Sequence, residues 1–312
     1  MISHQVMKTR KEFLRAWIWA TIHSWTGGQV FLYLKGPGGT GKSTFANLLI
    51  AIAGKENTVN TTLKDLATSP FETSFLADKK LIILSDIESY KGDLSIIKQI
   101  SGGDPLRGRR KYSNNNFDVD IMGTMVMTGN SEITSRDTQN ALGRRLRVFP
   151  ADNVCNPKDR KPLIIYDKRE GWTGQIANEL SAIFYWGFTM DPHKAKKLIS
   201  ETETMVPSLE ECTRESKENL NPLLSWIQDE LEPGEGSYIG FKMRDDIKGY
   251  IETSRRKPLY PTYRIWAKKR EVWPLGHKRF SSELLWTLGD LKYKVKKIKK
   301  TEGMYVYTRY CS

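Results

Sequence analysis

Residues 36–44, GPGGTGKST, have residue types and a spacing that could do chemistry. Gly36, Gly41, Lys42 and Ser43 satisfy the pattern G-x-x-x-x-G-K-[ST], whose glycines let main-chain N–H groups turn toward a phosphate chain. Lys42 would neutralise the β- and γ-phosphates of a nucleotide, and the Ser43 hydroxyl would bind Mg²⁺. The alternative is a strand-to-helix turn without a ligand, but such a turn has no use for a Lys-Ser pair at this spacing. The predicted phosphate-binding residues are Gly36, Pro37, Gly38, Gly39, Thr40, Gly41, Lys42, Ser43 and Thr44.

The segments on either side of this loop predict how it is held. Residues 30–34 are apolar and predict a buried strand. Residues 43–53 predict a helix that ends at Gly54. The N-terminus of that helix would present its N–H groups to the phosphates.

Two acids follow a second apolar run. Asp86 and Glu88 come directly after residues 81–84, LIIL, so they would lie at the end of a buried strand. Such acids can hold the water shell of Mg²⁺ and orient or deprotonate an attacking water. We expect Asp86 to bind the metal with Ser43, while either acid could be the base. The alternative is a pair of solvated loop residues.

A third apolar run ends in an amide. Asn130 follows residues 121–129, IMGTMVMTG, at the carboxyl end of a predicted strand, where the ligand crevice of an open α/β sheet lies. Its amide could hold the attacking water or the γ-phosphate. A simple Gly-Asn turn after a core strand is an equal alternative.

Between these two strands the sequence predicts a basic β-hairpin. Alternation of apolar residues with aspartates over residues 117–121 is typical of a strand, and an Asn-rich turn precedes it. Positive charges beside an aromatic ring suit the phosphates and bases of a single nucleic-acid strand. The alternative is a solvated loop. The candidate DNA-binding residues are Arg107, Arg109, Arg110, Lys111 and Tyr112.

Arginines precede the last strand of this region. In LGRRLRVFP, the side chains of Arg144, Arg145 and Arg147 are candidates for an arginine finger, which stabilises transition-state charge on a γ-phosphate. Surface ion pairs are the alternative.

Composition favours a nucleic-acid partner and excludes several other classes. The 312 residues carry a formal net charge of +13 with a pI near 9.5, and no long apolar run predicts a membrane span. No signal peptide precedes the first helix, and Cys155, Cys212 and Cys311 form neither a zinc pattern nor a disulfide framework. We therefore expect a cytoplasmic protein, in the host cytoplasm if a virus or plasmid encodes it.

Composition also predicts the domain organisation. Residues 1–28 predict one amphipathic packing helix, and residues 29–200 alternate strands with helices as in a parallel α/β sheet. The polar, Glu-rich residues 201–221 predict a linker. Residues 222–312 predict a second, basic domain, because residues 251–300 carry fifteen Lys or Arg against four Asp or Glu, a local net charge of +11.

The sequence of the second domain predicts helices followed by a basic hairpin. Apolar residues at helical spacing occur over residues 260–266 and 280–288, and strand-like alternation surrounds a turn at residues 301–303. This order suggests a winged helix, a fold that docks on nucleic acid. The alternative is a basic, solvated α+β lid.

The order of these motifs resembles superfamily 3 helicases, and most closely the poxvirus, satellite-phage and plasmid primase-helicase branch. The resemblance covers about residues 30–190. It implies that residues 36–44 are motif A, that Asp86 and Glu88 form motif B, and that Asn130 is the sensor of motif C. It further implies that Arg144 or Arg145 is the finger and that the basic hairpin grips DNA.

The same resemblance implies an AAA+-like P-loop ATPase core with a parallel sheet, joined to a C-terminal winged-helix-like domain. Such enzymes form hexameric rings and move 3′ to 5′ on a single DNA strand. Ile87 separates the two motif B acids, and only one helix precedes the phosphate loop, as a remnant of the helical collar of the family. A primase or polymerase domain could lie upstream in a longer protein.

These observations together predict an ATP- and Mg²⁺-dependent replicative DNA helicase that acts as a homo-oligomer on single-stranded and forked DNA. An initiator or loader ATPase that binds DNA without unwinding it fits every motif equally. A small-molecule kinase shares the phosphate loop but has no use for a basic hairpin, so DNA stimulation of ATPase activity separates it from the other two.

Overall fold

The structure is a computed structural model that describes residues 4–85, 87, 94–109, 116–133, 141–231, 237–239, 259–270, 272, 274–291, 293–300 and 303–310. Contacts within the chain divide it into two compact units, and the boundary falls between Lys217 and Glu218. No described helix is both long enough and apolar enough to cross a membrane.

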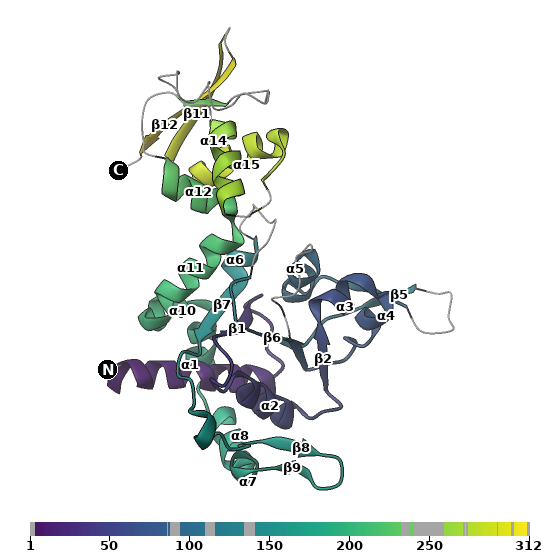
Figure 1. Cartoon of the computed structure of the whole chain (residues 1–312). Coiled ribbons are helices and arrows are strands. Elements are labelled where there is room, and N and C mark those ends of the chain that lie inside the picture. Colours follow the sequence, from purple (N-terminus) through teal and green to yellow (C-terminus); the bar gives the residue numbers. More distant parts are fainter. Residues whose placement is uncertain are drawn as a thin grey trace. The chain divides into compact units, whose positions relative to one another are not determined.

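A five-stranded sheet forms the centre of the first unit (Figure 1). Every neighbouring pair of its strands is parallel, so their carboxyl ends share one edge. Leu32, Val126 and Ile83 lie side by side in register at its middle and are almost fully buried. The α/β class with a parallel sheet, predicted from the sequence, is confirmed. The strand order is β2 (Thr58–Thr62), β3 (Leu81–Ser85), β6 (Thr124–Gly129), β1 (Phe31–Lys35) and β7 (Leu146–Pro150).

Helices pack against this sheet in one hydrophobic cluster. The helix predicted within residues 1–28 is α1 (His4–Ile22), and it buries Phe13, Trp17 and Ile18 as its spacing indicates. It contacts α2 (Lys42–Ala53), α8 (Leu180–Phe188) and α9 (Pro192–Ser200). α1 is therefore part of the core of the first unit.

Shorter elements complete the first unit. Two small antiparallel sheets are formed by β4 with β5 and by β8 with β9. The remaining elements are α3 (Leu63–Thr68), α4 (Pro70–Ser74), α5 (Ser95–Gly102), β4 (Leu106–Arg109), β5 (Asn116–Val119), α6 (Ala141–Arg145), η2 (Pro157–Asp159), β8 (Ile165–Asp167), β9 (Gly171–Thr173) and α7 (Gln175–Asn178).

The stretch predicted as a linker, residues 201–221, folds as helix over most of its length. It contains α10 (Thr202–Met205), η3 (Pro207–Leu209) and α11 (Glu210–Leu220). Val206 and Leu209 are fully buried in the core of the first unit, and Thr213 and Ser216 are buried on one face of α11. The glutamates whose side chains the structure describes here are exposed, so the stretch is polar in composition and amphipathic in structure.

The second unit has its own core. Helices α12 (Pro222–Glu230), α14 (Leu259–Lys269) and α15 (His277–Asp290) pack around Trp226, Tyr263 and Phe280. A three-stranded sheet follows the order β10 (Ser237–Ile239), β12 (Gly303–Tyr310) and β11 (Tyr293–Lys300). The two helices and the terminal hairpin expected from the sequence are present in this unit.

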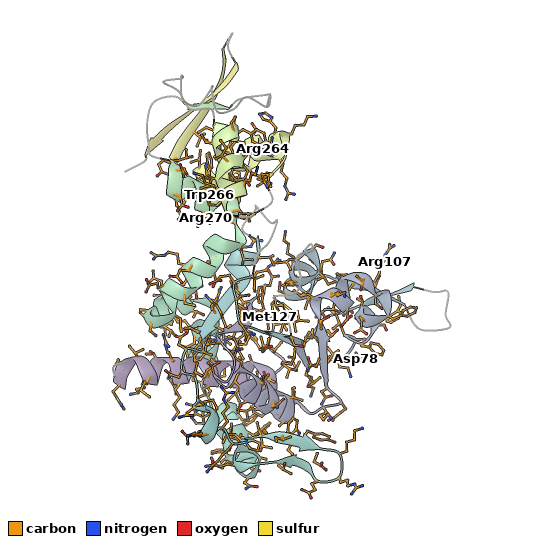
Figure 2. All side chains as sticks on the ribbon, viewed as in Figure 1. Asp78, Arg107, Met127, Arg264, Trp266 and Arg270 are labelled. Carbon is orange, nitrogen blue, oxygen red and sulfur yellow. The ribbon has the colours of Figure 1, made fainter. Side chains whose placement is uncertain are left out.

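An aromatic and ionic contact joins α12 to α14 within this unit. Asp229 accepts hydrogen bonds from the indole Nε1 of Trp266 at 3.0 Å and from Arg270 at 2.8 Å. The guanidinium of Arg270 also lies 5.2 Å from the centre of the Trp266 ring (Figure 2). Asp229 thus orders the C-terminal end of α14.

Candidate functional site

The glycine-rich loop joins the end of β1 to the start of α2 at the carboxyl edge of the sheet. The N–H of Gly36 donates to the carbonyl of Gly129 at 3.2 Å, and the N–H of Ala151 donates to the carbonyl of Lys35 at 2.6 Å. The carbonyl of Ala151 lies so close to Gly36 that a Cβ at position 36 would collide with it. Only glycine therefore fits the first position of this loop.

Lys42 turns back over the loop from the first turn of α2. Its ammonium donates to the carbonyls of Gly36 at 2.5 Å and Pro37 at 2.8 Å, and to the amide oxygen of Asn130 at 3.0 Å. Two elements expected from the sequence to form one site, the loop and the end of β6, are thus joined through a single side chain.

A polar cavity of about 290 Å³ lies in front of this lysine. The glycine-rich loop with the first residues of α2 forms one wall, and the end of β6 forms the other. Its lining residues are Gly38, Gly39, Thr40, Gly41, Lys42, Ser43, Thr44, Thr128, Gly129 and Asn130. Such a cavity suits an anionic group of several oxygens.

A second cavity, mostly apolar and of about 460 Å³, has one lining residue, Thr40, in common with the first. No sequence pattern predicts this cavity, because its walls come from helices distant in the chain. α1 contributes Leu14 and Ile18, α2 contributes Phe45 and Leu48, and α8 contributes Ile183 and Trp186. Met7, Arg10, Lys11 and residues 149–153 complete the lining.

The loop after β6 is held by side chains of β1. The hydroxyl of Tyr33 donates to the carbonyl of Ser131 at 2.5 Å, and Lys35 forms an ion pair with Glu132. Burial acts to lower the pKa of Lys35, but the hydrogen bond from Lys35 to Glu132 and the nearby negative charges outweigh it and raise that pKa. Neither contact was predicted, because no local pattern signals a pairing of residues about a hundred positions apart.

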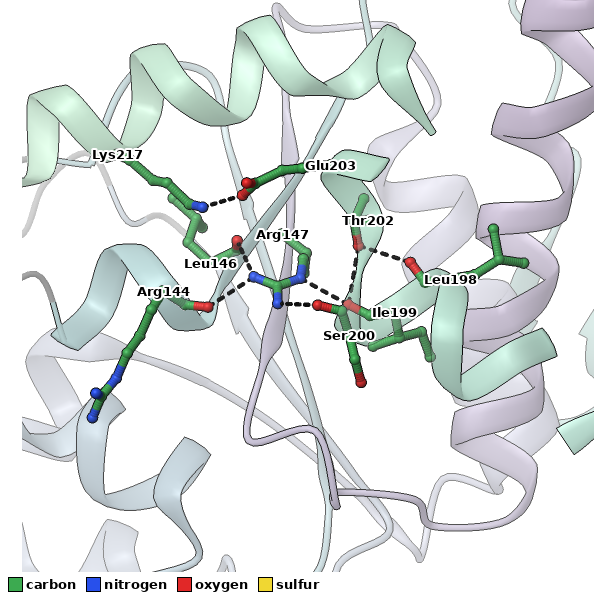
Figure 3. A network of polar contacts seen from close by, with 9 residues as sticks. All are labelled: Arg144, Leu146, Arg147, Leu198, Ile199, Ser200, Thr202, Glu203 and Lys217. Carbon is green, nitrogen blue, oxygen red and sulfur yellow. Dashed lines mark hydrogen bonds and ion pairs between the residues drawn. The ribbon is translucent and has the colours of Figure 1, made fainter. Parts of the chain in front are cut away.

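The three arginines before β7 are placed in different ways (Figure 3). Arg147 is buried and donates to the carbonyls of Ile199 at 2.7 Å, Ser200 at 2.8 Å, Arg144 at 2.8 Å and Leu146 at 3.0 Å. Burial lowers the pKa of its guanidinium. Arg147 therefore holds α9 to β7 and is not available to a nucleotide.

Arg144 and Arg145 differ in what they contact. Arg145 donates to the carbonyl of Lys98 in α5 at 3.0 Å. The Arg144 side chain is exposed, its guanidinium points away from Arg147, and it makes no hydrogen bond or ion pair with the described residues. Of the two predicted finger candidates, Arg144 is the more accessible.

The predicted basic hairpin is present as the antiparallel pair of β4 and β5. Leu106 faces Val119 on its buried side, and Arg107 faces Asp118 on its exposed side (Figure 2). The backbone of Arg109 pairs with that of Asn116. The predicted residues Arg110, Lys111 and Tyr112 lie outside the described residues, as do the acids Asp86 and Glu88 after β3.

Residues 151–160 form a further wall that sequence analysis missed. The N–H of Cys155 donates to the carbonyl of Gly39 at 3.0 Å, and the Nε of Arg160 donates to the carbonyl of Cys155 at 3.2 Å. The guanidinium of Arg160 lies against Gly39, where φ is +82° and a side chain would collide with it. The loop is therefore enclosed by a segment that follows it by more than a hundred residues.

One family model and one known protein match part of this chain in sequence. A family model described as a family of unknown function (DUF5906) matches residues 34–145. The uncharacterized mitochondrial protein ymf20 of Marchantia polymorpha is 33% identical over 141 residues, which are 45% of this chain and 83% of that protein.

Solved structures with a similar chain path include two of the NrS-1 C-terminal region. The A form apo structure has a TM-score of 0.45 and 14% identity, and the match covers 98% of this chain and 76% of that one. The apo structure of residues 305–718 has a TM-score of 0.42 and 14% identity, with coverage of 97% and 76%.

Proposed function

The chain belongs to the protein family that includes ymf20, and we propose that it is an ATP- and Mg²⁺-dependent DNA helicase of the superfamily 3 type. The observation that carries this proposal is the position of Lys42, whose ammonium lies between the glycine-rich loop and Asn130 at the wall of a polar cavity. A lysine held at this point by main-chain and amide oxygens can exchange them for phosphate oxygens when a nucleotide enters.

Two cavities that share Thr40 in their lining support a nucleoside triphosphate in preference to a smaller anion. The polar cavity takes the phosphates, and the apolar cavity beyond Thr40 takes the base, with Phe45 and Trp186 available for ring contacts. The guanidinium of Arg15 lies 5.0 Å from the Trp186 ring centre and its Nε donates to the Trp186 carbonyl at 2.8 Å, so Arg15 helps to orient that ring.

The residues at the start of α2 suit a magnesium ion. The Ser43 hydroxyl lines the polar cavity and has no hydrogen-bond partner among the described residues, and hydroxyl oxygen is a ligand that Mg²⁺ accepts. A bound Mg²⁺ would neutralise charge that develops on the phosphates. Asp86 is the proposed second protein ligand, and Glu88 or Asp86 is the proposed base for the attacking water.

Asn130 and Arg144 supply the remaining roles. Asn130, fixed by Lys42 on one side, would orient the attacking water or the γ-phosphate. The exposed Arg144 would act as an arginine finger in the site of a neighbouring subunit, because its guanidinium has no partner among the described residues of its own chain. This role requires a homo-oligomer, for which a hexameric ring is the proposal.

DNA is the proposed track of this motor. The exposed face of the β4–β5 hairpin carries Arg107 in a region that continues into Arg109, Arg110, Lys111 and Tyr112. Residues 251–300 of the second unit carry fifteen Lys or Arg against four Asp or Glu, which suits a winged-helix-like contact with forked DNA. A primase or polymerase domain in a longer protein would place this motor in replication.

A strand-displacement assay on a labelled fork tests the proposal. Wild-type protein with ATP and Mg²⁺ should release the labelled strand, whereas Lys42→Ala should not, although both bind the fork. Lys64→Ala, which removes an exposed lysine from α3, is the matched control and should unwind normally. Hydrolysis that DNA stimulates without any strand release would instead identify an initiator or loader ATPase.

A further inference from the structure

The loop of Asn130, Ser131 and Glu132 after β6 is tied to β1 at two points. Tyr33 and Lys35 are two residues apart on β1, so their side chains leave the same face of the strand. Tyr33 contacts Ser131, and Lys35 contacts Glu132. Asn130 lies immediately before these two anchored residues.

The first tie is made inside the protein. The Tyr33 residue is fully buried, and its hydroxyl donates to the main-chain carbonyl of Ser131 at 2.5 Å. A hydrogen bond to main chain fixes the backbone itself, so it constrains where the preceding residue can point.

The second tie is an ion pair that is mostly shielded from water. The side chains of Lys35 and Glu132 are 20% and 26% exposed, so solvent weakens their attraction less than at the surface. The second carboxylate oxygen of Glu132, Oε2, is buried without a hydrogen-bond partner among the described residues. Lys35 is therefore the principal compensation for the negative charge of Glu132.

These two contacts join the strand that leads into the glycine-rich loop to the segment that follows Asn130, so they connect the two walls of the polar cavity. Lys35 is the last residue of β1 and precedes Gly36, where the glycine-rich loop begins. Gly36 itself donates to the carbonyl of Gly129, next to Asn130. A change in Lys35 or Glu132 would thus move the loop and Asn130 relative to one another.

We propose that Tyr33, Lys35 and Glu132 are positioning residues that set the Asn130 amide against Lys42 and against the γ-phosphate of a bound nucleotide. This proposal rests on the proposed ATPase function of the same cavity. None of the three residues lines the polar cavity, so they act on a bound nucleotide through the position of Asn130 relative to the loop. A displacement of Asn130 by about 1 Å would slow the chemical step, as misplaced catalytic groups do.

Three variants test this proposal with different risks to folding. Tyr33→Phe keeps the buried ring and removes one hydrogen bond. Glu132→Gln keeps the shape and removes the ion pair, and the double variant Lys35→Glu/Glu132→Lys restores the pair with its charges exchanged. Tyr33→Phe and Glu132→Gln should each lower kcat for ATP hydrolysis about tenfold, while the Kd of ADP stays within about twofold of wild type. The double variant should have a kcat between that of Glu132→Gln and that of wild type.

A matched control separates positioning from general stability. Lys194 and Glu12 form an ion pair between α9 and α1, with the two side chains 50% and 19% exposed. Lys194→Gln, which removes this pair from the side of α9, should alter the melting temperature by as much as Glu132→Gln or less, and it should leave kcat unchanged.

The decisive readout is a double-mutant cycle with Asn130→Ala. If Glu132 acts through Asn130, Glu132→Gln should lower kcat in the wild-type background and have no further effect on Asn130→Ala. Effects that multiply in the double variant, or a Glu132→Gln enzyme as fast as wild type, would overturn the positioning role. Failure of wild type to hydrolyse ATP faster than Lys42→Ala would instead overturn the proposed function from which the inference starts.

Discussion

The ammonium of Lys42 lies 3.0 Å from the amide oxygen of Asn130, so the first turn of α2 and the end of β6 meet across one polar cavity. The contact joins residues 88 positions apart in the chain. An amide oxygen at this place attracts the lysine without adding a charge that would repel phosphate.

Asn130→Asp should therefore weaken nucleotide binding. The new carboxylate would hold the Lys42 ammonium and place a negative charge beside the phosphates, so we expect the Kd of ATP to rise about tenfold or more. Asn178→Asp, on the exposed end of α7, adds the same charge away from the cavity and should not change the Kd. Equal affinities for the two variants, measured by calorimetry, would show that Asn130 does not face the phosphates.

Substitutions of Arg147 and Arg144 should have different effects, the first on stability and the second on ATP turnover. Arg147→Met leaves four carbonyl contacts unmade in a buried place, so the free energy of unfolding should fall by about 2–4 kcal/mol. Arg144→Ala should leave unfolding unchanged and reduce ATP turnover by roughly three decades. Urea denaturation and an ATPase assay on both variants check the pair. The reverse pattern would exclude Arg144 as the finger.

Mixing inactive subunits tests whether Arg144 acts on a neighbour. Lys42→Ala and Arg144→Ala chains should each be nearly inactive, and their mixture should recover part of the turnover. Recovery is expected because some subunit boundaries would join an intact glycine-rich loop to an intact arginine. A mixture that co-assembles and remains inactive would contradict action in trans.

Filling the apolar cavity should weaken binding of the nucleotide base and leave binding of the phosphates unchanged. Ile183→Trp places a larger side chain in that cavity, so ATP should bind at least about tenfold more weakly while inorganic triphosphate binds as in wild type. Tyr185→Trp is the control, since Tyr185 lies on the same helix and is 68% exposed. If Ile183→Trp binds ATP as wild type does, the base does not bind in the apolar cavity.

The pKa of the Cys212 thiol should depend on the positive charge of Lys35. Burial raises the pKa of this thiol, while the positive charge of Lys35 acts to lower it. In a chain with Cys155 and Cys311 replaced by serine, Lys35→Met should raise the pKa further, so alkylation at a fixed pH should slow. The rate of iodoacetamide reaction against pH measures this shift. A lowered pKa in Lys35→Met would place Lys35 away from Cys212.

Much of the fold follows from local sequence. Short-range periodicity predicts β1, α1 and α2, and also the helices and hairpin of the second unit, because each depends on which face of an element is apolar. The meeting of Asn130 with Lys42 follows from one further rule, that parallel strands deliver their carboxyl ends to the same edge.

Other features depend on pairings that no local pattern reveals. Lys35 with Glu132 and Arg160 with Gly39 join distant segments, and each partner alone resembles an ordinary surface residue. Composition was also a poor guide to residues 201–221, since α10 and α11 need only one buried face to join the core. Arg147 looked like its neighbours in sequence and differs from them only through burial.

The proposed DNA-dependent ATPase activity is best measured as the rate of ATP hydrolysis with and without single-stranded DNA, on wild type and on Lys42→Ala. Wild type should show Mg²⁺-dependent turnover that single-stranded DNA stimulates and that Lys42→Ala abolishes, with the two proteins melting at the same temperature. Turnover that survives Lys42→Ala, or that does not respond to DNA, would contradict the proposed activity.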